Sequence, residues 1–326
     1  MVRDAGAHVR VGDLDETALL ARVVPLMPTR ALLGPGDDAA LVAAPDGRVV
    51  ATTDVLVEHR DFRRDWSSGA DVGWKAVAQN VADVAAMGGR CTGLLIGLSV
   101  PTDLPVAWVE DFARGVAAAC AHLDAVVVGG DLSAASEVVV SVTALGDLGG
   151  RAPVLRSGAR AGDVVAVAGV LGRSAAGLRV LQRGGSRSSA EEDLVGAHRR
   201  PRPPVAAGPA AALAGATALM DVSDGLLRDA GRIAAASAVT VELTTAGALG
   251  EWARDLEQRL GRERGHGVAL VLTGGEDHAL LGCFPPDAVL PVPFAPVGVV
   301  AATSPHGVLV DGRTWAGATG WDHFAR

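Results

Sequence analysis

The 326-residue chain has no tyrosine, only 3% aromatic residues and a single lysine, Lys75. With so few aromatic side chains, the core has to be built from Val, Leu and Ala, which suits tightly packed α/β layers. Lysine is the usual point charge for phosphate. Any phosphate site must therefore rely on other groups, and a lysine-containing phosphate loop is excluded away from Lys75.

Cysteine, basic charge and long apolar runs are also scarce. The three cysteines, Cys91, Cys120 and Cys283, lie far apart, which excludes a disulfide framework and a zinc-site spacing. We expect buried free thiols in a reducing cytoplasm. The net charge of -8 argues against nucleic acid. No signal-peptide core and no apolar run of about 18 residues is found, so we expect a cytoplasmic protein without membrane contact.

Acidic residues next to glycines are what the chain does have. Glycine lets the backbone approach a ligand closely, and clustered carboxylates are typical ligands of Mg²⁺. This pattern indicates an enzyme that handles nucleotide phosphates through aspartate-held Mg²⁺. The positions are Gly36-Asp37-Asp38, Thr52-Thr53-Asp54, Asp83, Gly129-Gly130-Asp131, Asp221-Val222-Ser223-Asp224-Gly225 and Gly274-Gly275-Glu276-Asp277.

The hydrophobic pattern predicts two α/β domains, 1–148 and 149–326, with the boundary in a glycine-rich stretch. A strand followed by Gly-Gly-acid in each half is a weak sign of related halves. Helices are predicted over 13–30 with Asp13 as a possible N-cap, 71–88, 105–122, 174–183, 224–236 and after Pro204, with a loose segment at 184–192. Strands are predicted over 48–56, 93–100, 125–128, 137–145, 164–168, 218–222, 239–243, 268–272 and 279–284.

The individual acidic positions each allow two interpretations. Asp37 and Asp38 repel each other, so their turn is either a cation site or an acidic surface turn. Thr52-Thr53-Asp54 ends a predicted strand, where its oxygens can converge on Mg²⁺, although Thr and Asp are also common strand and turn residues. Asp83 lies beside Asn80 on an otherwise apolar helix, so its carboxylate is paired, metal-bound or solvated.

The later positions follow strands. Gly129-Gly130-Asp131 is expected at the C-terminal end of a buried strand, which is either a phosphate and metal site or a tight turn. Asp221 and Ser223 share a face if extended. Ser223 or Asp224 can alternatively cap the helix that follows.

Taken together, the motifs resemble those of thiamine-monophosphate kinases and run in the same order from about residue 13 to the end. The matching segments are Gly-Asp-Asp-Ala-Ala (36–40), Thr-Thr-Asp-Val-Leu-Val (52–57), Lys75 to Gly88, Gly-Gly-Asp (129–131), Arg-Ser-Gly-Ala (156–159), His-Arg-Arg-Pro-Arg-Pro (198–203), Met-Asp-Val-Ser-Asp-Gly-Leu (220–226), Leu-Thr-Gly-Gly-Glu-Asp (272–277) and Gly-Trp-Asp-His-Phe (320–324).

The resemblance implies transfer of the ATP γ-phosphoryl group to thiamine monophosphate, the final step of thiamine diphosphate biosynthesis. It also implies the two-domain α/β fold of aminoimidazole ribonucleotide synthetase and a homodimer. Several Mg²⁺ ions would be held by Asp38, Thr52, Thr53, Asp54, Asp83, Asp131, Asp221 and Asp224. Gly130, Asp131, Arg156 and Ser223 would contact ATP, and Glu276 and Trp321 the thiamine substrate. Arg156 can pair bidentately with phosphate, and Trp321 can stack on the thiazolium unless it anchors the core.

No catalytic residue is implied beyond the metal and phosphate ligands, because the acceptor phosphate is already anionic. One position departs from the family. A substrate-contacting His usually precedes Phe62, and this chain has Asp61 there. If the segment is extended, His59 lies on the same face as Asp61 and can replace that contact, as can Arg60.

The alternatives are other ATP-dependent members of the same fold and an inactive nucleotide-binding protein. The cysteines expected of a selenophosphate synthetase or a carbamoyl dehydratase are missing from the two ends of the chain. The motif sequences resemble those of aminoimidazole ribonucleotide synthetase less well. An inactive protein is expected to lose metal ligands, and here every expected aspartate is present.

Overall fold

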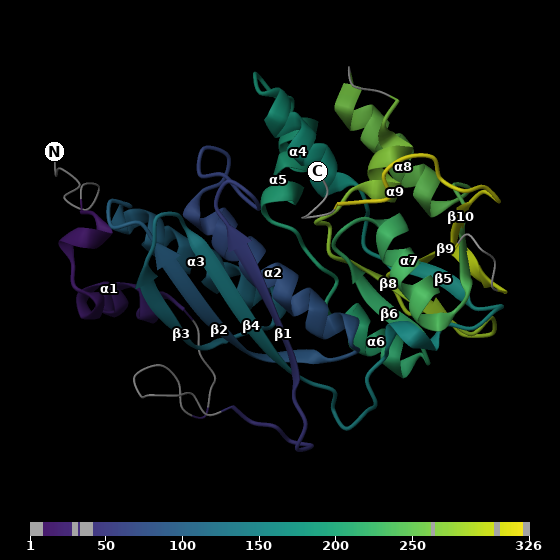
Figure 1. Cartoon of the computed structure of the whole chain (residues 1–326), viewed down its shortest axis with the longest axis horizontal. Helices are drawn as coiled ribbons and strands as arrows, with labels where there is room; N and C mark the ends of the chain where they lie inside the picture. The colour runs from purple at the N-terminus through teal and green to yellow at the C-terminus, as the bar shows by residue number, and fades with distance from the viewer. Residues whose placement is uncertain (1–8, 28–31, 33–41, 262–264, 303–306, 322–326) are drawn as a thin grey trace. The chain divides into compact units, whose positions relative to one another are not determined.

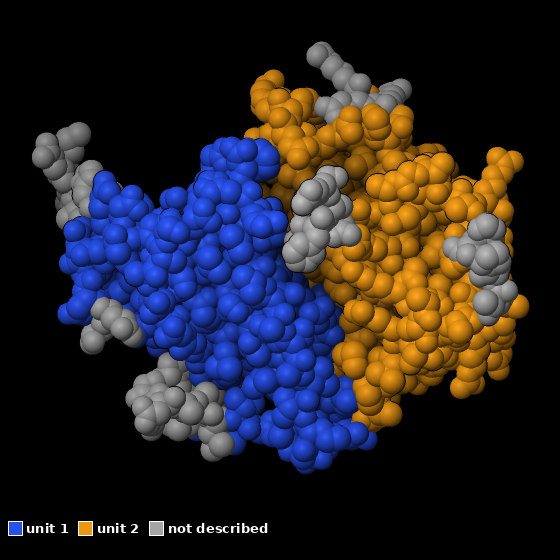
Figure 2. All heavy atoms as spheres, in the orientation of Figure 1, with its two compact units in different colours: residues 1–84, 91–150 blue, residues 85–90, 151–326 orange. Residues whose placement is uncertain are grey.

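The computed structural model describes residues 9–27, 32, 42–261, 265–302 and 307–321 (Figure 1). The chain forms two compact units, coloured separately in Figure 2. Unit 1 comprises Met1–Val84 and Cys91–Gly150, and unit 2 comprises Ala85–Arg90 and Arg151–Arg326. None of the described helices is long and apolar enough to cross a membrane.

Unit 1 is built on a four-stranded sheet with the order β1-β4-β2-β3. Its strands are β1 (Val50–Val57), β2 (Arg90–Val100), β3 (Val127–Ala134) and β4 (Val139–Asp147). β1 pairs antiparallel with β4, and β2 pairs parallel with β3. Three helices belong to this unit: α1 (Glu16–Val23), α2 (Gly69–Ala86) and α3 (Val106–Leu123).

Helices α2 and α3 run along one face of this sheet (Figure 1). The two helices approach each other closely at Gly115, which has no side chain. A Cβ at this position would lie only 2.1 Å from the Ala70 carbonyl oxygen. Val77, Ala78 and Val81 of α2 are almost fully buried, which makes this helix the centre of the core of unit 1. The opposite face of β1 carries exposed side chains at alternate positions, including Val55.

Unit 2 contains a six-stranded sheet with the order β10-β7-β9-β5-β8-β6. Its strands are β5 (Val164–Ala168), β6 (Ala218–Val222), β7 (Thr240–Leu243), β8 (Ala279–Phe284), β9 (Phe294–Ala301) and β10 (Val308–Val310). Its helices are α4 (Arg173–Arg183), α5 (Ser189–Arg199), α6 (Ala207–Leu213), α7 (Leu226–Ser237), α8 (Ala248–Leu260) and α9 (Gly267–Thr273). β6 and β8, which carry the acidic motifs at their ends, are buried along their whole length.

Three predicted local features were wrong. Residues 268–272 form helix α9 rather than a strand, because a short apolar run fits either element. The Gly-Gly-acid of unit 2 thus follows a helix, which removes the sign of related halves. Asp15, not Asp13, caps α1, accepting from the Ala18 amide at 2.7 Å. Residues 189–192 open α5 through a capping box between Ser188 and Glu191.

The three cysteines are free thiols, as expected from their spacing. Cys120 and Cys283 are buried, and burial raises the pKa of each thiol to about 12. Cys91 is half-buried, and its pKa is raised to about 11 for the same reason. These thiols are therefore protonated and unreactive at neutral pH.

Candidate active site

Strand β1 and helix α2 bring together three of the predicted metal ligands. The Thr52 hydroxyl donates to Oδ2 of Asp83 at 2.8 Å. Two residues along β1, the Asp54 amide donates to Oδ1 of Asn80 at 3.1 Å, one helical turn before Asp83. Thr52 and Asp54 therefore share the face of β1 that meets α2. The motif lies inside β1 and does not end the strand as predicted.

Thr53 points the other way. Its hydroxyl donates to the Val142 carbonyl of β4 at 3.0 Å and accepts from the Thr143 hydroxyl at 3.1 Å. Successive side chains of a strand lie on opposite faces, so the Thr53 hydroxyl cannot join Thr52 and Asp54 on one ion. The prediction is therefore wrong for the Thr53 hydroxyl.

Gly130 and Asp131 lie within β3, not in a turn after it, because β3 continues to Ala134 in parallel pairing with β2. A Cβ at Gly130 would lie 2.1 Å from the Ile96 carbonyl oxygen, so glycine is required for this pairing. Asp131 is exposed. Strands β4 and β2 separate it from β1, so this sheet does not bring Asp131 beside Asp54. Asp38 lies outside the described residues.

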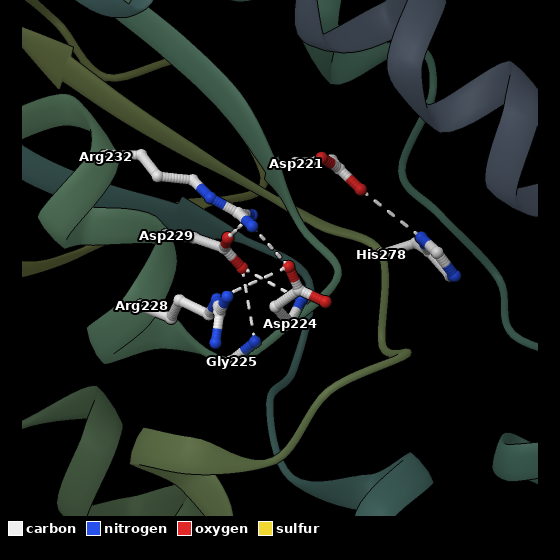
Figure 3. A network of polar contacts seen from close by, with 7 residues as sticks. All are labelled: Asp221, Asp224, Gly225, Arg228, Asp229, Arg232 and His278. Carbon is white, nitrogen blue, oxygen red and sulfur yellow. Dashed lines mark hydrogen bonds and ion pairs between the residues drawn. The ribbon is translucent and has the colours of Figure 1, made fainter. Parts of the chain in front are cut away.

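In unit 2, two adjacent segments carry Asp221 and the Gly-Gly-Glu-Asp motif. Asp221 is buried at the end of β6, with Oδ2 3.3 Å from Nδ1 of His278 (Figure 3). The Glu276 amide donates to the Ser223 carbonyl at 2.7 Å, and the His278 amide donates to the Val222 carbonyl at 3.1 Å. The two motifs, which are more than fifty residues apart in the chain, therefore form one backbone cradle.

Asp224 and Asp229 share one arginine at the start of α7. Nη2 of Arg232 lies 2.5 Å from Oδ2 of Asp224, and Nη1 lies 2.5 Å from Oδ1 of Asp229 (Figure 3). Arg228 also approaches Asp224, with Nε at 3.8 Å from Oδ2. Asp229 is fully buried, and its pKa is raised to about 6 by burial and then by the charge of Asp221, whereas Arg232 lowers it.

The capping alternative for Ser223 and Asp224 is wrong. Neither Ser223 nor Asp224 caps α7, whose N-cap residue is Gly225 at φ 120°. Instead, Oδ2 of Asp229 accepts from the amides of Asp224 and Gly225 at 3.1 and 3.2 Å. A carboxylate inside the first turn thus satisfies the free amides at the start of the helix.

Glu276 lies in the left-handed region at φ 65°, an uncommon conformation for a residue with a Cβ. Oε2 of Glu276 lies 3.4 Å from Nδ1 of His198 in α5, and the same nitrogen lies 3.1 Å from the Ser174 hydroxyl. The next residue, Asp277, accepts from the amides of Gly172 and Ser174 at 2.6 and 2.8 Å and so caps α4. Burial raises the pKa of Asp277 to about 7.

The other two predicted contacts in unit 2 are exposed. Arg156 lies in a short 3-10 turn, where its carbonyl accepts from the Ser237 hydroxyl at 2.7 Å. The Trp321 amide donates to the Asp224 carbonyl at 2.8 Å, and the residue is 58% exposed. Trp321 is therefore not a core anchor.

The segment after β1 is a turn, so the extended conformation that would place His59 and Asp61 on one face does not form. His59 is exposed in the left-handed region at φ 69°, and its amide donates to the Phe62 carbonyl at 2.8 Å. Oδ2 of Asp61 accepts from the Val57 amide at 2.8 Å, so Asp61 closes the turn. The buried Glu58 carboxylate also stabilises the turn. Its Oε1 accepts from Nε of Arg64 at 2.5 Å, and its Oε2 accepts from the Val138 amide at 3.2 Å.

The donor set fits Mg²⁺ chemically, because it consists of carboxylate and hydroxyl oxygens. Among the described residues, no three His, Cys, Asp or Glu side chains come close enough to hold a metal ion together. Asp38 is not among them, and the predicted ligands are divided between the two units, with Asp221 and Asp224 in unit 2.

Sequence reasoning missed the residues that hold the predicted ones. Asp229 and Arg232 are three residues apart and Asp224 and Arg228 four apart, so helical spacing alone could have signalled these pairs. His198 and His278 had no such signal, because each contacts a residue from another part of the fold.

The chain matches two family models in sequence. Residues 36–148 match the AIR synthase related protein N-terminal domain, and residues 160–308 match the AIR synthase related protein C-terminal domain. Hydrogenase maturation protein HypE in complex with ATP has the same fold, with a TM-score of 0.70 at 18% identity over 91% of this chain and 89% of that one. The chain is thus a two-domain protein of the AIR synthase-like α/β class.

More similar proteins define the family within this class. The thiamine-monophosphate kinase of Mycobacterium tuberculosis (strain H37Rv) is 48% identical over 95% of this chain and 92% of its own length. That of Corynebacterium glutamicum is 39% identical over 96% and 95%. A structure described as AaThiL complexed with AMPPCP and TMP has a TM-score of 0.76 at 33% identity, covering 97% of this chain and 99% of that one. The chain belongs to the thiamine-monophosphate kinase family.

Proposed function

We propose that this chain transfers the γ-phosphoryl group of ATP to the phosphate of thiamine monophosphate, giving thiamine diphosphate and ADP. The observation that carries the proposal is the 48% identity to a thiamine-monophosphate kinase over 95% of the chain. The relative solved with AMPPCP and TMP supports the two substrates. The reaction completes thiamine diphosphate synthesis.

The donor set supports Mg²⁺ as the metal. Bound Mg²⁺ would neutralise the phosphates and stabilise the charge that develops in the in-line transition state. In unit 1, Thr52, Asp54 and Asp83 provide oxygens from β1 and α2. In unit 2, Asp221 and Asp224 provide carboxylates. The remaining ligands of the proposal are Asp38, Asp131 and the Thr53 backbone.

The chain's own side chains bind and orient the two substrates. Arg156, exposed on its turn, pairs with an ATP phosphate, and Gly130, Asp131 and Ser223 complete the nucleotide contacts. Trp321 stacks on the thiazolium, and the Glu276 carboxylate faces the cationic substrate. No general base is needed, because the attacking oxygen is anionic at neutral pH.

At the departure from the family, the geometry favours His59 over Asp61 as the substrate contact. The Asp61 carboxylate is engaged by the Val57 amide, whereas the His59 side chain is 65% exposed. Asp61 therefore keeps the turn closed, and His59 takes the contact with the substrate phosphate.

We also propose a cytoplasmic homodimer. The exposed face of β1, with Val55 49% exposed, and Leu95 of β2, 37% exposed, give unit 1 a partly apolar sheet face. Such a face is a natural contact for a second copy of the chain. Light scattering on the purified protein should give the dimer mass, and Val55→Glu should shift it to the monomer. A monomeric wild type would contradict the dimer.

The test of function is ADP formation by the purified chain with Mg²⁺-ATP and thiamine monophosphate, with free thiamine as control. Turnover that requires the monophosphate is expected. ATP binding without turnover would favour the second candidate, an inactive nucleotide-binding protein. Turnover with free thiamine alone would overturn the choice of acceptor.

A further inference from the structure

The Asp224–Arg232–Asp229 bridge joins two carboxylates that are held in different ways. Asp229 is fully buried, and its Oδ2 accepts two backbone amides. The Asp224 side chain is 20% exposed, and its Oδ2 meets the side chains of Arg232 and Arg228. Backbone amides fix Asp229, whereas Asp224 is held by the long side chains of two arginines.

One guanidinium serves both carboxylates through separate nitrogens, each at 2.5 Å (Figure 3). Arg232 can therefore release Asp224 and keep Asp229 by a change in its outer torsion angles. The reverse exchange would leave a buried carboxylate without its cation, which is strongly unfavourable.

We propose that Arg232 is a substitute cation for the metal at Asp224. In the metal-free protein it neutralises Asp224. When a divalent cation takes Asp224, Arg232 stays on Asp229 alone. The inference rests on the proposed assignment of Asp224 as a metal ligand, and it assigns Arg232 a role that the reaction itself does not require.

Competition follows from this geometry. The guanidinium contacts Oδ2 of Asp224, and its positive charge repels a divalent cation that approaches the same carboxylate. Arg232 therefore weakens metal binding while it stabilises the empty site. A residue that only positioned Asp224 would have the opposite effect, because its removal would weaken metal binding.

The experiment is a Mg²⁺ titration of the full chain without nucleotide or thiamine monophosphate, followed by the melting temperature. Arg232→Gln should melt below the wild type without metal. Added Mg²⁺ should then raise the melting temperature of this variant more than that of the wild type. Half-maximal stabilisation should occur at about a tenfold lower Mg²⁺ concentration, equivalent to about 1.4 kcal/mol. Arg232→Lys, which keeps the charge but loses the fork, should lie between them and covers the case in which the glutamine variant does not fold.

The matched control is Arg259→Gln. Like Arg232, Arg259 is a helix arginine paired with a carboxylate of its own helix, in this case Asp255 at 2.7 Å. This substitution makes the same change in net charge and should leave the Mg²⁺ dependence unchanged. Equal or weaker Mg²⁺ binding by both Arg232 variants would overturn the inference, as would absence of any Mg²⁺ effect. The melting temperature can be measured without turnover. If Arg232→Gln bound Mg²⁺ more tightly but the wild-type chain had no kinase activity, the result would contradict only the proposed function.

Discussion

The Thr52 hydroxyl and the Asp83 carboxylate are joined by a 2.8 Å hydrogen bond between an edge strand and the helix that follows it. One turn away, the buried Asn80 holds the Asp54 amide and donates through Nδ2 to the Ala76 carbonyl at 2.9 Å. The strand and the helix are thus fixed to each other at two points, and the oxygen ligands between them are preorganised.

Asp83→Asn should reduce kcat/KM by about a hundredfold or more, the usual cost of removing one stabiliser of transition-state charge. It should also raise the Mg²⁺ concentration needed for half-maximal turnover. Steady-state rates over a Mg²⁺ series measure both effects. Asp103→Asn, an exposed turn residue of the same unit, is the matched control and should behave as wild type. Wild-type rates with an unchanged Mg²⁺ dependence in Asp83→Asn would disprove the metal assignment.

Gly130→Ala should destabilise unit 1, because its Cβ would lie 2.1 Å from the Ile96 carbonyl oxygen. A backbone clash of this kind costs about 2–3 kcal/mol, which corresponds to a fall of about 5 °C or more in melting temperature. Gly97→Ala is the control, because the atoms nearest to its Cβ are 3.8 Å away in ordinary contact. Thermal unfolding of both variants decides the point. Equal melting temperatures would mean that β3 is not paired to β2 as described.

His59→Ala and Asp61→Ala should separate substrate contact from turn closure. His59→Ala should raise KM for thiamine monophosphate about tenfold to a hundredfold, the value of one hydrogen bond to a charged group, with KM for ATP unchanged. Asp61→Ala should lower the melting temperature by about 2–4 °C through the lost bond to the Val57 amide, worth about 1 kcal/mol. If Asp61→Ala raised KM while His59→Ala did not, the two roles would have to be exchanged.

The buried Asp277 should make stability fall between about pH 4 and pH 7. Burial raises its pKa to about 7, whereas the unfolded chain loses the proton near the ordinary value of about 3.9. Between these values the folded state holds a proton that the unfolded state has released, so stability decreases as pH rises and then levels off. From pH 4 to pH 8, the melting temperature of the wild type should fall relative to that of Asp277→Asn, whose side chain does not titrate in this range. Parallel curves would show that Asp277 is ionised throughout, held by its two amide donors.

Several strands could be predicted from the sequence because their apolar residues are buried in the folded protein. The strands at 164–168, 218–222 and 279–284 were predicted with the bounds that the structure shows, since each is a short and mainly apolar run. The run at 268–272 has the same composition and became a helix. Its length fits both elements, and tertiary packing against α8 decided between them.

The types of residue and their order along the chain are enough to show which groups can provide the chemistry. Carboxylates next to glycines, a single lysine and a fixed order of motifs define the family regardless of how the side chains are oriented. The partners of these groups depend on the folded chain. Thr53 points away from Thr52, Asp61 closes a turn, and Arg232 bridges Asp224 to Asp229. The reason is physical. A motif fixes the type and spacing of groups along the chain, whereas hydrogen bonds and burial depend on which segments the fold brings together.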